Sequence, residues 1–578
     1  MTVPPGPAFS VRDIPFSYYG SWFDISPVLA ERVYAEDLHL VSHTTGMHPV
    51  LSLIPWQDGG RAETTVLAAP HRLVWQHDSA TIELAYEQAD TVRIRGEGIG
   101  LRIRAAVKAL TPFAGTYFYR DPVDNSFVFT VYATGRRYRI TLLEGAVIDV
   151  VGDQSVGSNE RALTLTSDGG TWEVAIEEFE SSRAAYTGLR SFDEVLRAAQ
   201  GAFADFVNAV APWRNEATPA AELAAYVLWS ATVLPAGFIR RPAILMSKHW
   251  MDKVWSWDHC FNALALAGRL PELAWDQFRV VFDHQDDAGG LPDSITHSEI
   301  LYNFVKPPIH GWAIKKLRER QKVERAELVQ AYHGLAKWTN YWLVMRRAPG
   351  HALCHYHHGN DSGWDNATTF DAERVVETSD LAAFLVLQTR QLADLATELG
   401  ILAEATYWAE TSDEMCAAML AQLWIADRFI SRGAESGRTH SSSSLLDLMA
   451  IVLGAELPDD VRTTLAGRIE AHLTVHGLAT ELVSSAAYQP DGYWRGPIWA
   501  PSTILVEDGL RRAGFIDLAD EISKRFRGLC ERSGFAENFD AETGVGLRDH
   551  AYTWTASSYL ILAAAHTQRQ LTTAAALE

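Results

Sequence analysis

The chain contains 578 residues, of which 47% are hydrophobic and 21% are charged. These fractions are those of an ordinary globular protein, so they exclude bulk disorder and collagen-like order. The formal net charge is −22, and no basic stripe is visible, which argues against nucleic acids and anionic membranes as partners. No apolar run reaches the ~18 residues of a membrane span, and the first residues lack a basic or apolar segment. Together with four scattered cysteines, this predicts a cytoplasmic protein without a signal peptide.

Residues 1–190 have the pattern of β-strands. Period-two alternation with β-branched and aromatic residues occurs over 91–107, 125–133 and 136–152. Turn clusters stand between such runs, at 57–60, 120–122 and 167–170. Many short strands with regular turns predict an N-terminal antiparallel β-sandwich domain over 1–190.

From about residue 191 the periodicity becomes helical. The segment 191–215 has a Ser/Asp start and apolar residues at helical spacing, which predicts a linker helix. Amphipathic patterns then predict helices over 220–234, 325–345, 378–400, 403–424, 443–455, 458–473, 500–514, 516–534 and 555–570. The region 216–578 has room for about twelve helices in six hairpins. We therefore predict a mainly α chain whose catalytic domain is an (α/α)6 barrel, or toroid, with a loop-lined mouth suited to ligands.

Tryptophan is abundant and unevenly placed. Of 19 tryptophans, four precede residue 191 and fifteen follow it, so the enrichment belongs to the helical region. Large flat rings serve either as core filler or as platforms for flat ligands. Trp338, Trp342 and Trp408 stand at helical spacing and are core candidates.

Five loops mix Trp or Tyr with Asp, Glu, Asn, Gln or Arg, at 249–258, 284–293 followed by Lys306-Pro-Pro, 359–366, 491–499 and 536–544. Sugars need this mixture, because their apolar C–H faces stack on indole rings while their hydroxyls bond carboxylates and amides. The loops therefore favour a carbohydrate ligand.

Several of these loops match known motifs in order. The segment Asp361-Ser-Gly-Trp-Asp365-Asn-Ala is similar to the ESGWDFS of trehalases, and Tyr493-Trp-Arg-Gly-Pro-Ile-Trp499 is typical of glycoside hydrolase family 63. Glu537 opens a segment ending in Thr-Gly, followed by Tyr552-Thr-Trp-Thr-Ala. The helical region thus resembles family 63 and the related trehalases, which are inverting α-glycosidases on an (α/α)6 barrel. It departs from trehalases in having Asp361 in place of Glu and Ala where Ser is common.

The resemblance implies that Asp365 is the general acid and Glu537 the general base. Inversion needs a protonated carboxyl and a carboxylate roughly 6.5–9.5 Å apart, which leaves room for the attacking water. Desolvation by Trp364 would raise the pKa of Asp365, as a proton donor requires. The predicted substrate-binding residues are Trp255, Trp257, Asp258, Gln285, Lys306, Trp364, Asn366, Tyr493, Trp494, Arg495 and Trp499.

Plainer interpretations remain open at several of these positions. Asp365 alone has the pattern of a helix N-cap, Trp255 and Trp257 that of core aromatics, and Lys306-Pro-Pro that of a rigid turn. Glu542 is the alternative general base. Cysteine and histidine at Cys354, His355, His357 and His358 are donors that zinc accepts, but no second ligand pair follows at fixed spacing. We predict no metal and no cofactor and leave the role of this cluster open.

The predicted function is an inverting, exo-acting α-glycosidase. It would hydrolyse an α-glucoside, namely a disaccharide, a short oligosaccharide or a small glycoside such as glucosylglycerate. The alternatives are an inverting phosphorylase on the same barrel, in which phosphate replaces water, and a non-catalytic carbohydrate-binding protein. The expected partner is a small carbohydrate. The choice between glucose and mannose and the formation of homo-oligomers stay open.

Overall fold

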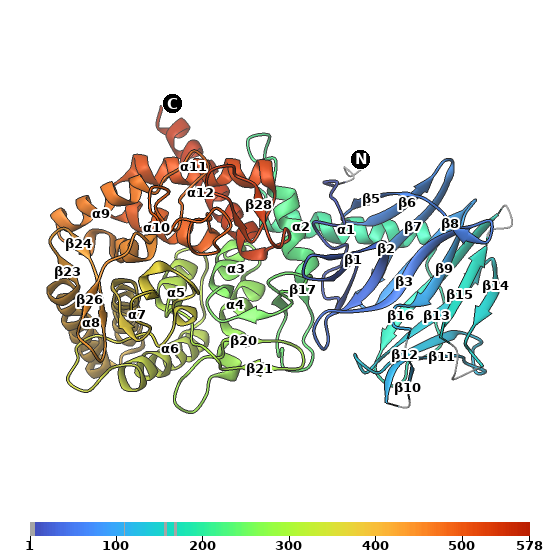
Figure 1. Cartoon of the computed structure of the whole chain (residues 1–578), viewed down its shortest axis with the longest axis horizontal. Coiled ribbons are helices and arrows are strands. Elements are labelled where there is room, and N and C mark those ends of the chain that lie inside the picture. The colour runs from blue at the N-terminus through green and yellow to red at the C-terminus, as the bar shows by residue number, and fades with distance from the viewer. Residues whose placement is uncertain (1–5, 109, 112, 155–158, 167–169, 578) are drawn as a thin grey trace. The chain divides into compact units, whose positions relative to one another are not determined.

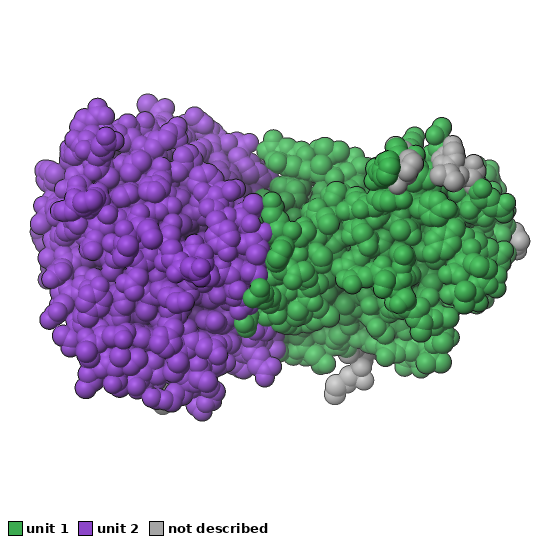
Figure 2. All heavy atoms as spheres, turned by 90° about the horizontal axis from the view of Figure 1, so that it is seen from below, with its two compact units in different colours: residues 1–212, 225–253, 296–299 green, residues 213–224, 254–295, 300–578 purple. Residues whose placement is uncertain are grey.

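The computed structural model describes residues 6–108, 110–111, 113–154, 159–166 and 170–577. The chain forms two compact units, which Figure 2 colours green and purple. Unit 1 comprises residues 1–212, 225–253 and 296–299, and unit 2 comprises residues 213–224, 254–295 and 300–578. The predicted domain limits at residues 190 and 215 stay a prediction. Most of the turn predicted at 167–170 lies outside the described residues.

Two large antiparallel sheets make up most of unit 1 (Figure 1). Within the described residues, the first sheet has the order β1-β2-β3-β9-β15-β14, with β4 beside β3, and the second has the order β10-β11-β12-β13-β16-β8-β7-β6-β5. The bounds of the first sheet's strands are β1 Phe23–Ala30, β2 Val33–Ser42, β3 His48–Gln57, β4 Gly60–Arg61, β9 Gly100–Ala105, β14 Ala146–Val151 and β15 Ala162–Thr166. Those of the second are β5 Thr65–Ala69, β6 Arg72–His77, β7 Ala80–Gln88, β8 Thr91–Glu97, β10 Leu110–Thr111, β11 Ala114–Arg120, β12 Phe127–Val131, β13 Arg136–Glu144 and β16 Thr171–Phe179. All three predicted strand regions are therefore strands.

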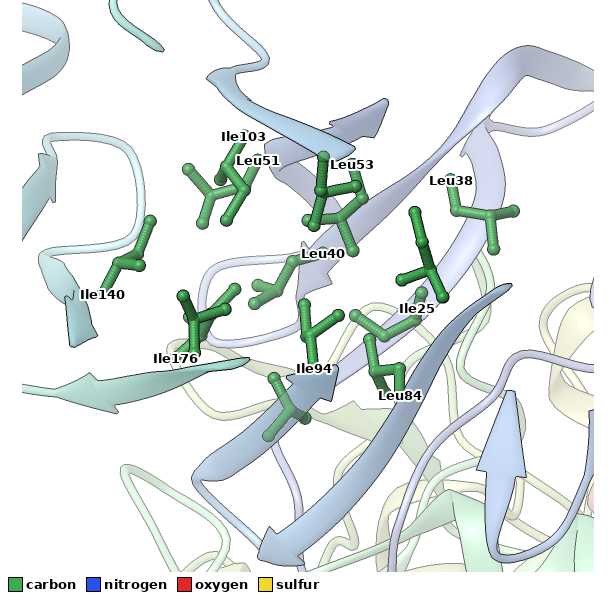
Figure 3. Close-up of a cluster of buried hydrophobic side chains, with 14 of the residues drawn as sticks. Ile25, Leu38, Leu40, Leu51, Leu53, Leu84, Ile94, Ile103, Ile140 and Ile176 are labelled. Carbon is green, nitrogen blue, oxygen red and sulfur yellow. The ribbon is translucent and has the colours of Figure 1, made fainter. Parts of the chain in front are cut away.

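The two sheets share one hydrophobic core. Leu40 and Leu53 of the first sheet belong to the same buried cluster as Ile94 and Ile176 of the second (Figure 3). Each of these four side chains is at most 1% exposed. In β6 and β7 the core residues alternate along the strand, namely Leu73 and Trp75 in β6 and Ile82, Leu84 and Tyr86 in β7, as period-two patterning dictates. A core enclosed by two antiparallel sheets is consistent with the predicted β-sandwich.

Helix α1 (Phe192–Val210) follows β16 in the chain and packs on β7. Ser191 caps it through a capping box with Glu194, so this helix starts where its sequence predicts. Helix α2 (Ala221–Ala231) has residues in both units.

Unit 2 is mainly helical (Figure 1). Its helices are α3 His259–Leu266, α4 Pro271–Arg279, α5 His310–Arg318, α6 Arg325–Met345, α7 Ser379–Leu399, α8 Leu402–Leu423, α9 Asp459–Ala471, α10 Ala500–Arg512, α11 Ile516–Ser533 and α12 Thr553–Leu577. Helix α7 packs against α8, α10 packs against α11, and α12 packs against α3. None of the described helices has the length and apolarity needed to span a membrane.

Short strands and 3-10 helices fill the connections. The strands are β17 Thr232–Val233, β18 Ala243–Ile244, β19 Val254–Trp255, β20 Ser294–Ile295, β21 Ile300–Leu301, β22 Val376–Glu377, β23 Trp424–Ile425, β24 Arg428–Phe429, β25 Ser431–Gly433, β26 Thr439–His440, β27 Asn538–Phe539 and β28 Gly546–Leu547. The 3-10 helices are η1 Phe282–His284, η2 Gly359–Ser362, η3 Thr368–Phe370 and η4 Leu445–Glu456.

The predicted helices agree with the structure except at a few places. The predicted helix over 443–455 is the 3-10 helix η4, which Gly454 interrupts with a φ of 61°. Helices α3, α4 and α5 were not predicted. Each has only eight or nine residues, and little more than two turns shows too few repeats for a helical period to stand out.

Candidate active site

The predicted acid Asp365 follows the one-turn helix η2. Gly363 ends this turn in the left-handed region, with a φ of 75°. A Cβ atom at this position would lie 2.5 Å from the indole ring of Trp257. Backbone strain and steric contact therefore both disfavour a side chain here. Glycine lets residues 359–366, which we call the acid loop, pack directly on Trp257.

Asp361 ties the acid loop to the segment that carries Lys306. Its carboxylate accepts hydrogen bonds from the backbone N–H groups of Val305, at 3.1 Å, and His357, at 2.8 Å. The guanidinium of Arg346 donates a third hydrogen bond, also at 2.8 Å. Asp361 is 1% exposed, so this residue, which replaces the Glu of trehalases, is engaged by protein donors.

Tryptophan rings form a continuous wall in unit 2. The ring centroids of Trp364 and Trp494 are 4.6 Å apart, and Trp494 stacks on Trp499 at 4.1 Å. Trp554 meets Trp499 edge-on at 5.5 Å and Trp257 edge-on at 5.6 Å. These five side chains are 1–3% exposed. They therefore pack mainly on one another, and they form a rigid apolar backing for the polar groups beside them.

Lys306 lies in the middle of a charged cluster. Its Nζ is 3.4 Å from Oδ1 of Asp293 and 3.9 Å from Oδ1 of Asp365. It also donates a hydrogen bond to the carbonyl of Asn360, at 2.9 Å, and lies 5.5 Å from the ring centroid of half-buried Trp255. The structure thus brings together three of the residues for which the sequence predicts a role, Trp255, Lys306 and Asp365.

Asp258 and Asp365 both have raised pKa values. Burial raises the pKa of Asp258 to about 8; the charge of Lys306 opposes this effect, and the charges of Asp365 and Asp293 add to it. Burial also raises the pKa of Asp365, with Lys306 again opposing and Asp293 adding. Oδ2 of Asp258 is buried and has no hydrogen-bond partner among the described residues. A buried polar atom of this kind is suited to a hydroxyl group of a ligand.

Glu537 precedes β27, and its N–H donates a hydrogen bond to the carbonyl of Asp549 at 2.6 Å. The residue is 3% exposed. Burial raises the pKa of Glu537 to about 8; the charges of Asp549 and Asp365 raise it, whereas Arg548 and a hydrogen bond with Tyr493 lower it. Since the charge of Asp365 acts on Glu537, the fold brings two carboxyl groups that are distant in sequence within electrostatic range of each other.

Tyr493, the first residue of the segment 493–499, interacts electrostatically with both of these carboxyl groups. Tyr493 has a φ of 64°, and its carbonyl accepts a hydrogen bond from the indole N–H of Trp499 at 2.8 Å. The guanidinium of Arg548 lies 4.9 Å from the Tyr493 ring centroid. Burial raises the pKa of Tyr493, and the charges of Glu537 and Asp365 raise it further. A bulky residue in the left-handed region is strained, and such strain occurs mainly at functional sites.

Asn366 and Arg495 join the acid loop to this segment. The Asn366 side chain donates a hydrogen bond to the carbonyl of Gly492 and accepts one from the N–H of Trp494, both at 3.0 Å. The Arg495 guanidinium donates to the carbonyl of Asn366 at 2.8 Å and pairs with Asp371. Both side chains are therefore engaged in protein contacts that hold the loops together.

Gln285 is engaged in the same way, by a different part of unit 2. Its amide nitrogen donates hydrogen bonds to the carbonyls of Gly289, at 2.9 Å, and Gly334, at 3.0 Å. These bonds fix the loop after η1, and the role of Gln285 in substrate binding stays a prediction.

The Cys/His cluster has ordinary protein partners. The thiol of Cys354 donates to the carbonyl of Trp342, the rings of His355 and His357 stack at 5.2 Å, and Nδ1 of His358 accepts from the N–H of Asn360. In the part of the chain that the structure describes, no three His, Cys, Asp or Glu side chains are arranged to hold a metal ion.

Four residues of this site carry no predicted role, namely Asp293, Arg548, Asp549 and Tyr552. Burial raises the pKa of Tyr552, and the charges of Glu537, Tyr493, Asp258 and Asp549 raise it further, so this phenol lies among the site's charged groups. For two of these four residues, the sequence contains a pattern that could have indicated a role in the site. Asp293 ends a Gly-Gly-Leu-Pro-Asp loop, and Tyr552 opens the motif before the last helix.

Known proteins resemble the region of the chain that carries this site. The family profile of the mannosylglycerate hydrolase MGH1-like glycoside hydrolase domain matches residues 251–555. Mannosylglycerate hydrolase of Rubrobacter radiotolerans is 23% identical over 402 residues, covering 53% of this chain and 89% of the relative. Mannosylglycerate hydrolase MGH1 of Selaginella moellendorffii is 22% identical over 387 residues, covering 53% of this chain and 79% of the relative.

A solved structure is similar in fold. The family 63 mannosylglycerate hydrolase from Thermus thermophilus, in complex with glucose, has a TM-score of 0.51 and 21% sequence identity to this chain. The match covers 59% of this chain and 98% of that structure. The family profile spans more than half of the residues and includes Asp365 and Glu537. The chain therefore belongs to the mannosylglycerate hydrolase MGH1-like enzymes of glycoside hydrolase family 63, and it is a glycoside hydrolase.

Proposed function

We propose that the protein is an inverting, exo-acting α-glycosidase in which Asp365 is the general acid and Glu537 is the general base. The observation that carries this proposal is that the charge of half-buried Asp365 acts on the buried carboxyl group of Glu537, although the two residues come from separate loops. Two neighbouring carboxyl groups with raised pKa values suit this chemistry. Before the reaction the general acid must be protonated, whereas the general base must be ionised.

In the proposed reaction, Asp365 donates its proton to the glycosidic oxygen as the bond from C1 to that oxygen breaks. A water molecule attacks C1 from the opposite face, and Glu537 accepts the proton that this water loses. The products are a sugar with inverted configuration at C1 and the free alcohol. The hydrogen bond with Tyr493 favours the ionised form of Glu537, because it lowers the pKa of that carboxyl.

The sugar to be cleaved would bind beside half-buried Trp255, with a hydroxyl group at the buried oxygen of Asp258. We propose an α-glucoside or α-mannoside of a small polar aglycone, with glycerate as the first candidate. The names of the relatives supply glycerate, and the ammonium of Lys306 beside Asp365 supports an anionic aglycone. This cation lies 3.9 Å from the Asp365 carboxyl, to which the leaving group must bind.

We also propose that the helices of unit 2 form an (α/α)6 barrel. The packing of α12, the last helix, against α3 supports a closed ring. The four cysteines are free thiols in the structure, which supports a location in the reducing cytoplasm.

The experiment is a turnover assay of Asp365→Asn and Glu537→Gln on a panel of α-glycosides. The panel contains glucosylglycerate, mannosylglycerate, trehalose, kojibiose, nigerose and isomaltose. Each substitution removes one proton-transfer group and should lower kcat by at least about 100-fold on the best substrate, with an unchanged circular dichroism spectrum.

Glu542→Gln is the matched control, because Glu542 is exposed and lies five residues after Glu537, in the turn between β27 and β28. It should keep the wild-type rate. Loss of activity in Glu542→Gln with retention in Glu537→Gln would move the general base to Glu542. Wild-type rates in both Asp365→Asn and Glu537→Gln would refute the proposed function.

A further inference from the structure

Asp293 and Lys306 form a buried ion pair directly beside the proposed acid. Their side chains are 6% and 7% exposed, whereas that of Asp365 is 31% exposed. The ammonium of Lys306 is closer to Asp293 than to Asp365, at 3.4 Å against 3.9 Å. The pair is therefore fixed in the protein, while Asp365 is the member of the cluster that remains open to a ligand.

The backbone holds both members of the pair in place. The N–H of Asp293 donates to the carbonyl of Leu301 at 2.7 Å, and its carbonyl accepts from the N–H of Ser256 at 3.3 Å. Lys306 is anchored on the other side, since its ammonium donates to the carbonyl of Asn360. The N–H of the preceding residue, Val305, is bound to Asp361. These contacts fix the backbone at both residues, and the ion pair itself then sets how close the Lys306 ammonium lies to Asp365.

An ammonium this close to a general acid would normally work against it. A lysine that paired fully with Asp365 would favour the carboxylate and take away the proton that the reaction needs. Asp293 competes for the same ammonium and adds a negative charge of its own, and both effects favour the protonated acid.

We propose that Asp293 and Lys306 are positioning residues for the general acid: Asp293 holds the Lys306 ammonium at a distance at which Asp365 retains its proton. This inference rests on the proposed function of Asp365. The directions of the pKa effects at Asp365 agree with it, since Lys306 lowers that pKa and Asp293 raises it.

Other groups also act on Asp365 or feel its charge, and they contribute to its titration. They are His358 of the same loop, Asp258 at the start of α3, Tyr493 of the 493–499 segment and Glu537 before β27. Asp293 differs from these groups because it pairs directly with the ammonium that faces the acid. A single substitution of Asp293 or Lys306 therefore breaks this ion pair and leaves the other groups around Asp365 in place.

The test is the pH dependence of kcat/KM for Asp293→Asn and Lys306→Met, because the alkaline limb reports the pKa of the acid in the free enzyme. Asp293→Asn removes a negative charge and frees the ammonium to pair with Asp365. The alkaline limb should therefore move down by about one pH unit or more. Lys306→Met removes the positive charge, so the alkaline limb should move up. A merely structural role would not shift the limb in opposite directions for the two variants.

A second readout separates the acid from the rest of the site. An α-glycosyl fluoride needs little protonation of its leaving group, so both variants should lose much less activity on the fluoride than on the natural type of substrate. Asp508→Asn is the matched control, because Asp508 forms a comparable pair with Lys316, at 2.7 Å, between α10 and α5. It should leave both limbs in place.

The outcomes distinguish this inference from the function on which it rests. If Asp365→Asn is inactive but both variants keep the wild-type alkaline limb, the positioning role is wrong and the acid assignment stands. If Lys306→Met raises KM and leaves the limb unchanged, Lys306 contacts the sugar directly, and the positioning role is again wrong. If Asp365→Asn is fully active, the proposed function itself fails.

Discussion

Gly363→Ala disturbs the acid loop without removing a carboxyl group. The new Cβ would lie 2.5 Å from the Trp257 ring, so loop and ring must separate by about 0.9 Å to reach the 3.4 Å of an ordinary contact. Alanine at a φ of 75° adds about 1–2 kcal/mol of strain, and overpacking adds about 1–3 kcal/mol. We expect the free energy of unfolding to fall by about 2–5 kcal/mol. We also expect kcat/KM to fall by about 100-fold, because a shift near 1 Å misaligns a catalytic group.

Gly400→Ala is the matched control for this prediction. Gly400 caps α7 with a φ of 82°, and no atom lies within 4 Å of its added Cβ. It should therefore show the backbone strain alone, with wild-type kcat/KM. Urea unfolding and steady-state kinetics on the best glycoside measure both effects. If Gly363→Ala equals Gly400→Ala in stability and in activity, the packing of the acid loop on Trp257 does not matter for catalysis, and the reasoning is refuted.

Three further predictions concern protons. Tyr493→Phe removes a hydrogen bond that lowers the pKa of Glu537. The acid limb of kcat/KM should therefore move to higher pH, and activity at neutral pH should fall about 10-fold. An acid limb that stays at the wild-type pH would contradict this prediction. In the wild type, burial raises the pKa of Glu537 to about 8, and the base must be ionised. The acid limb of the pH–rate profile should therefore lie well above the ordinary carboxyl range near pH 4, and a limb near pH 4 would contradict the assignment. In unit 1, burial lowers the pKa of His43, but its hydrogen bonds to Asp24 and Asp252 outweigh burial and raise it from 6.5 to about 9. The stabilisation is then complete below pH 6.5 and is lost as the pH rises to about 9, so the stability advantage of the wild type over His43→Gln should shrink by about 3 kcal/mol across this range; a constant difference in urea unfolding would contradict the pairing.

Local sequence signals predict most of the fold. The long helices α6, α7 and α11 have about five to six turns, so their apolar period repeats often enough to define them. The capping box at Ser191 marks the start of α1. The short helices α3 to α5 escape prediction because so few turns hold too little periodic information. The 3-10 geometry of η4 escapes it because the kink at Gly454 depends on packing: a Cβ there would lie 2.7 Å from the side chain of Arg512.

The candidate site is predictable to a different degree at each residue. Asp365 and Glu537 stand in motifs that resemble those of family 63, so the sequence is enough to propose them as the general acid and the general base. The partners of Lys306 and Glu537 are not predictable in this way, because Asp293 and Asp549 reach them through tertiary contacts. Only the folded chain shows which tryptophans are buried in the core and which are exposed enough to contact a ligand. Sequence suggests ligand platforms, whereas Trp364, Trp494 and Trp499 are at most 2% exposed and pack on one another.

The central claim is that Asp365 and Glu537 act on opposite faces of an α-glycosidic bond. Proton NMR of the first minutes of turnover tests it most directly, because the anomeric configuration of the released sugar is visible before mutarotation. We predict that an α-glycoside releases the β-anomer first, with the α-anomer appearing later by mutarotation. Initial release of the α-anomer would show retention, and it would contradict the roles assigned to both residues.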